Sequence, residues 1–590
     1  MKENPIQFYT TQLQEKQAEL QQVKKKLSIS SLVRVFIFLT VVACIYFGYP
    51  STQIIIGAVV MGLAVFLFLL NRHTDLEYQR DKLKELIAIN QLEMDVKSGN
   101  LTKLDTGAEF IDPAHEYSHD IDLFGKKSFF QYVNRAVTLA GKKRLATVFT
   151  SNSIDKIIQK QDAIKELAKK PLWRQEFSAI GSLVNVTVSI KVIQEWFDHY
   201  KAFVPSVMKR IPLLFTLVSI AMVTLLFFDI VTFQVLLYWF FFGLGITGVY
   251  LKKINALYND ASKVQDTFEQ YYKLVALIEK ENFEADLLTE RKNLVITEKE
   301  KASVVLKQFA SILGAFDQRN NMLFGAVANG LLLWDIWQSS RIESWIAKHH
   351  DKVKDWFEVI SFFDTYNSLG NFAFNHPEFI YPKIVSGDVT IEAKNLGHPL
   401  LDPTKRVDND ITITNEQFFI ITGANMAGKS TFLRTVALQI VMSNVGLPVC
   451  AQSCNYRPIK LITSMRTADS LGDDASYFFA ELSQLKKIVE KLEEDEYFII
   501  LDEILKGTNS KDKASGSKKF VERLVNATAT GIIATHDLSL CEIANELPQV
   551  QNRYFDAQII QDELYFDYKF KDGICQNMNA SFLLKKMGIV

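Results

Sequence analysis

A glycine-rich octapeptide in the last third of this chain has the residue types that surround a phosphate group. Gly423-Ala-Asn-Met-Ala-Gly428-Lys429-Ser430 fits the pattern G-x-x-x-x-G-K-[ST]. An apolar run, 418–422, precedes it, and we expect a helix to begin near Lys429 and continue through 431–442. In that context the glycines let backbone N–H groups wrap phosphates at the N-terminus of the helix.

The octapeptide therefore predicts a site for ATP and Mg²⁺. Lys429 is placed to reach the β- and γ-phosphates, and the Ser430 hydroxyl is placed to bind the metal ion. The predicted nucleotide-binding residues of this segment are Gly423, Ala424, Asn425, Met426, Ala427, Gly428, Lys429, Ser430 and Thr431.

Two further apolar runs end in side chains that could act on a bound nucleotide. The run 497–501 leads into Asp502 and Glu503. We expect Asp502 to hold Mg²⁺, directly or through water, and Glu503 to orient and deprotonate the attacking water. The run 531–535 leads into His536, which could sense the γ-phosphate. The predicted catalytic residues are Lys429, Glu503 and His536, and the predicted metal ligands are Ser430 and Asp502.

These motifs require strands that alternate with helices. From about residue 381, short β-rich runs separated by Gly, Asn and Asp appear at 389–393, 418–422, 497–501 and 531–535. Helical segments lie between them, and one of these continues to Leu492 after Asp474 or Ser476, either of which could cap it. The alternation predicts an α/β domain. Residues of about 120–178 and 255–375 have helical patterns with few Gly or Pro, so a helical body precedes that domain.

Long apolar runs are concentrated in two places. Residues 35–49 and 54–70 are separated by only four residues, and 211–251 contains one charge, Asp229. The second stretch is long enough for two passes of roughly 20 residues each. Buried core helices are the alternative, but these runs are apolar on every face. We predict two transmembrane hairpins, which gives four spans.

Basic residues predict the orientation of the hairpins. They flank the spans but are absent from the two turns: Lys24, Lys25, Lys26, Arg34, Arg72, Lys209, Arg210, Lys252 and Lys253. By the positive-inside rule, both termini and the long segments are cytoplasmic. The predicted location is the cytoplasmic membrane, and no cleavable signal peptide is expected.

Charge and cysteine content limit the possible partners. Lys+Arg number 66 and Asp+Glu number 67, so the net charge is −1. A protein that binds nucleic acid along its whole surface usually has a basic excess, so any DNA contact here needs a local patch. Cys450 and Cys454 lack a second Cys/His pair, and we expect no structural metal.

Four segments together resemble, in order, the ATPase motifs of the MutS family of DNA mismatch repair proteins. They are TGANMAGKSTFLRTVAL, DDASYFFAEL, FIILDEILKGTNS and IIATHDL. Upstream, GHPLL at 397–401 resembles the family's entry into its ATPase domain, and 120–149 with QDAIKEL resembles the start of its lever domain. The resemblance implies an ABC-type α/β P-loop ATPase that forms a homodimer. It also implies that Ser476 reaches the partner's nucleotide and that ATP switches how lever arms hold DNA.

The chain departs from that family at several points. Before residue 120, a membrane hairpin stands in place of the mismatch-recognition and connector domains, and the Phe-x-Glu motif has no counterpart. The second hairpin stands where the family inserts its DNA clamp, and we expect the C-terminal helix-turn-helix to be missing. Leu505, Ala424 and Gly397 replace a glycine, a proline and an arginine. These departures weigh against mismatch recognition but leave ATP hydrolysis intact.

The predicted organisation has five parts: an N-terminal cytoplasmic helix (1–30), hairpin 1 (31–71), a linker helix (72–119), an all-α lever-like domain (120–380) interrupted by hairpin 2 (211–251), and an ATPase domain (381–590). The predicted function is a membrane-anchored MutS-like ATPase, with DNA as a possible partner. The alternatives are a transporter component and an ATP-binding membrane scaffold. Four spans are few for a translocation path, and no LSGGQ-like stretch precedes 497. Glu503 argues against a scaffold, because P-loop proteins without turnover commonly lack this base.

Overall fold

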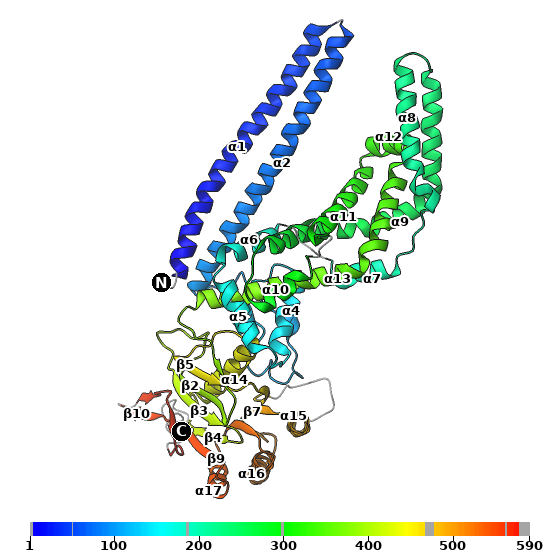
Figure 1. Ribbon diagram of the computed structural model, residues 1–590. Helices are drawn as coiled ribbons and strands as arrows, with labels where there is room; N and C mark the ends of the chain where they lie inside the picture. The colour runs from blue at the N-terminus through cyan, green and yellow to red at the C-terminus, as the bar shows by residue number, and fades with distance from the viewer. Residues whose placement is uncertain are drawn as a thin grey trace.

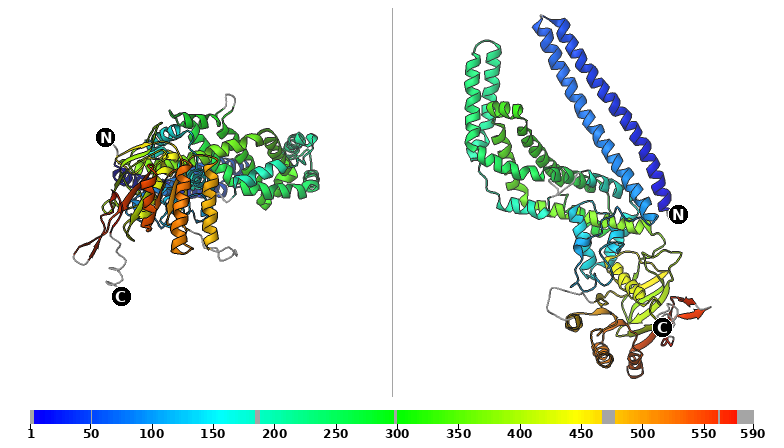
Figure 2. Two further views of the ribbon diagram at one scale, coloured as in Figure 1. Left: turned by 90° about the horizontal axis from the view of Figure 1, so that it is seen from below. Right: turned by 180° about the vertical axis from the view of Figure 1, so that it is seen from behind.

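The computed structural model of the protein describes residues 4–49, 51–183, 188–296, 300–466, 477–560 and 563–576. Its shape is elongated. Two helical hairpins point away from a C-terminal α/β domain, and a helical body lies between them (Figure 1). The view from behind in Figure 2 also shows both free hairpin ends at the end of the molecule farthest from the α/β domain.

Helices α1 (Pro5–Gly48) and α2 (Thr52–Lys97) form the first hairpin. α1 begins at a proline, whose missing N–H is tolerated in the first turn, and the Asn4 side chain accepts a hydrogen bond from the N–H of Ile6 at 3.0 Å. Near the body the two helices pack together through Val23, Leu27, Leu83 and Leu86. Each helix then continues without a break into its apolar half.

α2 ends at Lys97, whereas the sequence predicted a linker helix over 72–119. Gly99 has a φ of 87°, a left-handed conformation that terminates helices. Residues 98–128 form turns around one short 3-10 helix, η1 (Ala108–Phe110).

The second hairpin consists of α8 (Ile211–Phe227) and α9 (Phe233–Lys280). By length and composition, three of the described helices could cross a membrane: α1, α2 from Gly57 onward, and α9. The sequence predicted four spans. α8 has 17 residues and falls among the shorter apolar helices, as does α12 (Met322–Leu332).

The helical body is organised around α13 (Trp334–Asn375), which packs against helices α4, α5, α9 and α11. Phe357, Phe363 and Leu369 of α13 are fully buried. The remaining helices of the body are α3 (Phe129–Val133), α4 (Leu139–Thr150), α5 (Ile157–Ala168), α6 (Pro171–Ser182), α7 (Ile190–His199), η2 (Ser206–Lys209), α10 (Asp286–Asn293), α11 (Ala302–Asp317) and η3 (Gln318–Asn320).

The α/β domain is built on a six-stranded sheet of order β12-β9-β4-β8-β7-β6, parallel except for β12. Its strands are β4 (Phe418–Gly423), β6 (Lys460–Ser464), β7 (Tyr497–Asp502), β8 (Thr530–Ala534), β9 (Val550–Phe555) and β12 (Phe570–Asp572). A second sheet has the order β1-β5-β2-β3, with β1 (Lys383–Ile384), β2 (Val389–Leu396), β3 (Asn409–Thr414) and β5 (Ser453–Tyr456). β10 (Gln558–Ile560) pairs with β11 (Glu563–Tyr565). The helices are α14 (Lys429–Val445), α15 (Tyr477–Leu492), α16 (Ser510–Asn526), η4 (Leu538–Glu542) and α17 (Ile543–Glu546).

Strand β4 lies inside this sheet between β9 and β8, and all six of its residues are buried. Parallel neighbours on both sides bring the carboxyl ends of β4, β7 and β8 to one edge. That edge is where the three predicted motifs meet.

The helical body contacts the α/β domain through buried polar groups. The Asp120 carboxylate accepts hydrogen bonds from Thr463 Oγ1 at 2.6 Å and from the N–H groups of Met465 and Arg466. Asn152 Nδ2 donates to Leu461 O at 2.9 Å. These contacts fix the body on β6, the edge strand of the sheet.

Candidate functional site

The glycine-rich loop joins the end of β4 to the start of α14. Gly423 (φ 151°) and Gly428 (φ 99°) have backbone conformations that favour glycine. Met426 is a non-glycine residue in the left-handed region (φ 66°), and its side chain is exposed. No side chain of the described residues caps the N-terminus of α14. The first N–H groups of this helix are therefore free to bind an anion held in the loop.

The ammonium group of Lys429 lies inside the loop. It donates to Gly423 O at 2.6 Å and to Ala424 O at 3.0 Å, and the side chain is buried. Burial lowers the pKa of Lys429, and the carboxylates of Asp502 and Glu503 oppose that shift. The cation is thus positioned where phosphate charge would lie.

Ser430 and Asp502 meet at the carboxyl edge of the sheet. Ser430 Oγ in the first turn of α14 donates to Asp502 Oδ2 at the end of β7, at 2.6 Å. A hydroxyl and a carboxylate are the hard oxygen ligands that Mg²⁺ prefers. The structure therefore brings the two predicted metal ligands into contact.

Glu503 follows β7 in a strained backbone conformation. Its φ is 50°, which is uncommon for a residue with a side chain and is a feature of active sites. Its N–H donates to Ala534 O at 2.9 Å, which ties the residue to β8. Its carboxylate lies 3.2 Å from His536 Nε2 and 3.9 Å from Lys506 Nζ.

His536 connects the predicted base to the loop lysine. Its Nε2 atom lies 3.3 Å from Lys429 Nζ as well as near Glu503 Oε1. Burial and the positive charge of Lys429 lower the pKa of His536, while Glu503 and Asp502 oppose the shift. The imidazole is therefore neutral at neutral pH, and Nε2 either donates to Glu503 or accepts from Lys429.

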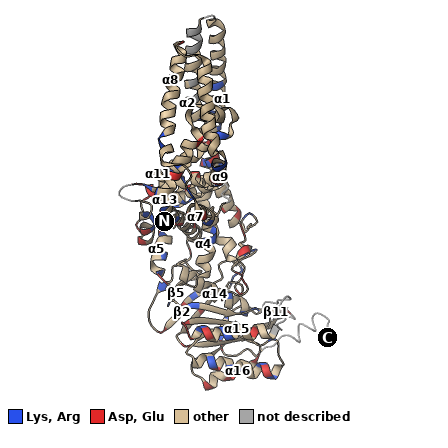
Figure 3. Cartoon of the chain, turned by 90° about the vertical axis from the view of Figure 1, so that its right-hand side faces the viewer, with Lys and Arg blue, Asp and Glu red and all other residues tan. Residues whose placement is uncertain are grey.

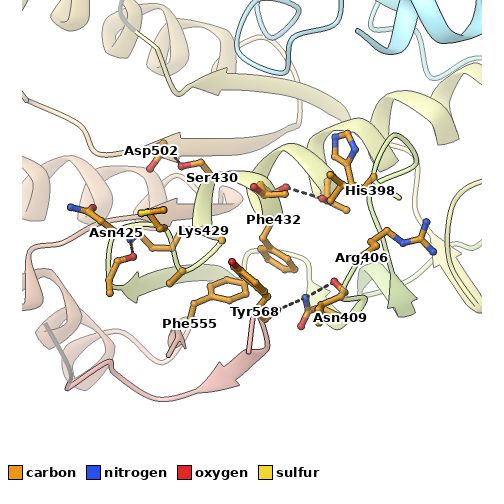
Figure 4. A pocket seen from close by; sticks show the side chains of 18 of the residues that line it. His398, Arg406, Asn409, Asn425, Lys429, Ser430, Phe432, Asp502, Phe555 and Tyr568 are labelled. Atoms are coloured by element: carbon orange, nitrogen blue, oxygen red, sulfur yellow. Dashed lines mark hydrogen bonds between the residues drawn. The ribbon is translucent and has the colours of Figure 1, made fainter. Parts of the chain in front are cut away.

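A cavity of about 770 Å³ lies over the loop. One end is formed by the residues above, and the far end is lined by His398 and Arg406. Asn409 and Tyr568 lie between the two ends, and a Cβ atom on Gly428 would lie 3.0 Å from Tyr568 Cδ1 (Figure 4). Asn409 Nδ2 donates to Tyr568 O at 3.0 Å, so β3 holds the segment that carries Tyr568 against the loop. A cavity with Lys429 in the loop and with aromatic, polar and basic side chains along the rest of its lining suits a nucleotide whose phosphates lie on the loop.

The sequence does not predict most of the cavity lining beyond the loop, Asp502, Glu503 and His536. His398 lies in the GHPLL segment, but that pattern predicts no role for its side chain. Arg406, Asn409 and Tyr568 carry no local pattern, and Tyr568 reaches the site from 159 residues beyond Asn409. Asp474 and Ser476 lie outside the described residues, and α15 begins at Tyr477.

Comparison with known proteins agrees with this geometry. MutS domain V matches residues 419–585, a range that holds the loop, Asp502, Glu503 and His536. The DNA mismatch repair protein MutS of Thermotoga maritima is 30% identical over 249 residues, which cover 41% of this chain and 31% of that protein. These matches support MutS family membership through a MutS domain V at residues 419–585.

Other MutS relatives match over similar parts of the chain. The DNA mismatch repair protein MutS of Methanococcoides burtonii is 31% identical over 259 residues, which cover 42% of this chain and 29% of the relative. Human MutS protein homolog 4 is 31% identical over 201 residues, or 32% of this chain and 21% of that protein. The chain thus spans less than a third of the length of these relatives.

The structure gives a reason for one departure from the MutS pattern. A Cβ atom on Gly397 would lie 2.2 Å from Asp408 Oδ1 and 2.3 Å from Arg406 Nε. Arg406 and Asp408 form an ion pair of 2.6 Å in that space. The guanidinium of Arg406 therefore packs against Gly397, at the position where the resemblance to the MutS family implies an arginine.

Proposed function

We propose that this protein is a membrane-anchored MutS-like ATPase, which binds ATP with Mg²⁺ over residues 423–431 and hydrolyses it. The observation that carries the proposal is a group of five side chains gathered at one end of the cavity: Lys429, Ser430, Asp502, Glu503 and His536.

The residues at this end fit a triphosphate and its metal ion. The uncapped N-terminus of α14 and the buried Lys429 provide positive charge for the phosphates. Ser430 and Asp502 would hold Mg²⁺, which neutralises phosphate charge when bound. Their 2.6 Å contact already places both oxygens at one point of the cavity.

Hydrolysis needs a base near the γ-phosphate. Glu503 would accept a proton from water as the water oxygen attacks phosphorus and the bond to the leaving ADP breaks. His536, 3.2 Å away, would orient that carboxylate by donating a hydrogen bond from Nε2. Lys429 would stabilise the charge that develops on the transferred phosphoryl group.

We further propose that the ATPase domains form a homodimer. The resemblance to the MutS family implies that Ser476 completes the nucleotide site of the partner subunit. Duplex DNA is a proposed partner, because the relatives named above are DNA mismatch repair proteins. The net charge of −1 restricts such contact to a local patch.

Membrane anchoring is supported by the exposed apolar halves of both hairpins. Leu32, Phe36 and Phe47 on α1 are at least 70% exposed, and none of the described residues in the apolar windows of α1 and α2 is buried. The outer parts of both hairpins carry few charged residues in Figure 3. So large an apolar surface is not stable in water, and it suits a bilayer.

The first experiment measures ATP turnover by the full chain reconstituted in liposomes, with and without Mg²⁺ and duplex DNA, at several salt concentrations. We expect turnover that EDTA abolishes and that Glu503→Gln reduces by about 10²–10⁴-fold while ATP binding persists. Equal turnover by Glu503→Gln would contradict the assignment of the base.

The response of the turnover rate to DNA distinguishes an ATPase that DNA regulates from one that DNA does not affect. A change in rate that fades with salt would support DNA as the partner. A basal rate that DNA leaves unchanged would support the ATPase and exclude DNA as its regulator. Extraction of the chain from membranes by alkaline carbonate would contradict the anchoring.

A further inference from the structure

Helix α12 (Met322–Leu332) is an uncharged apolar helix with one uncovered side. Its sequence, MLFGAVANGLL, contains no acidic or basic residue. Met322 and Leu323 are 87% and 80% exposed, and Val327 is 54% exposed. Gly325, Ala328 and Gly330, on the other side of the helix, are buried.

The buried side of α12 packs on the second hairpin at the middle of its apolar stretches. A Cβ atom on Gly243 of α9 would lie 2.3 Å from Gly330 O, so the two backbones touch. Gly330 also faces the ring of Phe240. Since 233–251 is the apolar part of α9, Gly243 lies at its centre. The end of α12 near Gly330 therefore lies beside the middle of the proposed span, measured along the axis of α9.

The other hairpin helix contacts α12 at an equivalent level. Ser219, near the middle of α8, donates from Oγ to Leu331 O at 2.6 Å. Trp239 Nε1 of α9 donates in turn to Ser219 Oγ at 2.8 Å. Figure 1 shows α12 beside both helices, on the part of the hairpin nearer the body.

Both ends of α12 have hydrogen-bond partners for backbone groups that a helix leaves open. The Asn321 side chain accepts from the N–H of Phe324 at 3.1 Å, and Ser219 satisfies the carbonyl of Leu331. Such partners are required where water is absent, because an open backbone group in hydrocarbon is costly. One open backbone group at each end of α12 is thus satisfied by a side chain.

Polar groups fix the position of α12 along the axis of the second hairpin. Arg319, just before the helix, donates to Asn255 Oδ1 at 2.8 Å and pairs with Asp335 at 3.1 Å, just after it. Asn255 follows Lys252 and Lys253, the basic residues at the cytoplasmic end of the proposed span. With 11 residues α12 is about 16 Å long, too short to cross a hydrocarbon core of about 30 Å.

We propose that α12 is a re-entrant membrane helix, which lies in the cytoplasmic leaflet beside the second hairpin and contacts lipid acyl chains through Met322, Leu323 and Val327. The exposed apolar side chains of α12 continue the apolar surface of α8 and α9, so the same bilayer covers all three. This inference rests on the proposed membrane anchoring of α8 and α9. It means that the turn between lever helices α11 and α13 is itself attached to the bilayer.

The test uses spin labels on single cysteines in the full chain, reconstituted in liposomes. Met322→Cys, Leu323→Cys and Val327→Cys are made in a Cys44→Ser background, because Cys44 is exposed while the other four cysteines are buried. Collision rates with oxygen, which enters lipid, are compared with those of a water-soluble nickel complex. ATP turnover of each labelled protein checks that it is folded.

Two control positions calibrate the result. Leu217→Cys reports the proposed span α8, and Val304→Cys reports the body, since both side chains are similarly exposed at 56% and 49%. We expect the α12 labels to match Leu217, with a ratio of oxygen to nickel collisions several-fold above that at Val304.

Two results would overturn the inference, and they are distinguishable. Lipid contact at Leu217 with water contact at all three α12 positions would remove the re-entrant helix and leave the anchoring intact. Water contact at Leu217 as well would remove the anchoring of the second hairpin, and the re-entrant helix with it.

Discussion

The side chain of Leu505 fills the space in front of Gly516: a Cβ atom added to Gly516 would lie 2.6 Å from Leu505 Cδ1. Leu505 is buried and has a left-handed backbone conformation (φ 59°), at the position where the MutS family usually has a glycine. It stands two residues after Glu503, whose φ is 50°. The contact with α16 therefore holds a strained turn next to the proposed base.

Replacing Leu505 by glycine has two effects of opposite sign on the free energy of unfolding. Relief of the left-handed strain is worth about 1 kcal/mol, whereas removing a buried leucine side chain costs about 2–5 kcal/mol. We expect Leu505→Gly to lower the unfolding temperature and the turnover number, although glycine is the family's own residue. Thermal unfolding and steady-state ATP hydrolysis measure both.

A second variant tests the same contact from the other side. Gly516→Ala places a methyl group against Leu505, so turnover should fall while ATP binding persists. Ser515→Ala, one residue earlier on α16 and exposed, is the matched control and should behave as the parent. Unchanged turnover in Gly516→Ala would show that the contact does not position Glu503.

His536 is expected to act by orienting Glu503. A hydrogen bond to a charged group contributes about 1.5–3 kcal/mol, so His536→Ala should reduce turnover by about 10–100-fold. ATP affinity should change little, because the imidazole contacts the base and the lysine and not the loop backbone. The control is His199→Ala, at an exposed residue of α7. Equal losses of turnover in both variants would contradict this role of His536.

The phosphate-loop end of the site could be predicted because its signals are local. A strand, a glycine loop and a helix follow each other directly, and an acidic pair ends another strand. Parallel pairing then brings Ser430 and Asp502 together without further information. The rest of the cavity lining depends on Asn409 holding the backbone of Tyr568, a contact between distant segments that no periodicity indicates.

Two features of the body were also beyond sequence reasoning. The helical pattern after residue 72 did not reveal that Gly99 takes a left-handed conformation and that α2 ends at Lys97. An 11-residue apolar run such as α12 cannot be distinguished from a buried core helix by its pattern alone. Its exposure became evident only when the packing of Gly330 on Gly243 fixed which side faces outward.

The stability of the ATPase domain should depend on the protonation of His398. Burial, with Arg434 and Arg406 nearby, lowers the pKa of His398 from 6.5 to about 4. Its Nδ1 accepts a hydrogen bond from the N–H of Leu400 at 3.3 Å, so protonation also removes an acceptor. Between these two pH values the unfolded chain binds a proton that the folded chain does not. Stability is therefore lost as pH falls through this window, by up to about 3 kcal/mol.

The measurement is the unfolding temperature at neutral pH and at about pH 5, for the parent and for His398→Asn. Asparagine can accept the same hydrogen bond but does not titrate, so the variant should lose less stability on acidification. Identical losses in both proteins would show that His398 does not contribute to the acid sensitivity.

A buried carboxylate joins the first hairpin to α13. Glu93 of α2 accepts hydrogen bonds from Arg135 Nε at 2.6 Å and from the side-chain amides of Asn371 and Asn375 on α13, each at 2.9 Å. Burial alone would raise the pKa of Glu93, but Arg135 and the two amides outweigh burial and lower it. Tyr9 of α1 donates to Asn375 Oδ1 at 2.8 Å, so both hairpin helices contact the last turns of α13.

Glu93→Gln should detach the first hairpin from α13, because it leaves Arg135 buried without a counter-charge, at a cost of about 3–5 kcal/mol. We expect a lower unfolding temperature and faster proteolysis of the 98–107 segment in liposomes. Glu85→Gln, two turns earlier on α2 and only half-buried, is the control and should leave both unchanged. Equal behaviour of the two variants would mean that the hairpin is held on α13 by apolar contacts such as Phe8 against Phe374. In that case Phe8→Ala, and not Glu93→Gln, would release it.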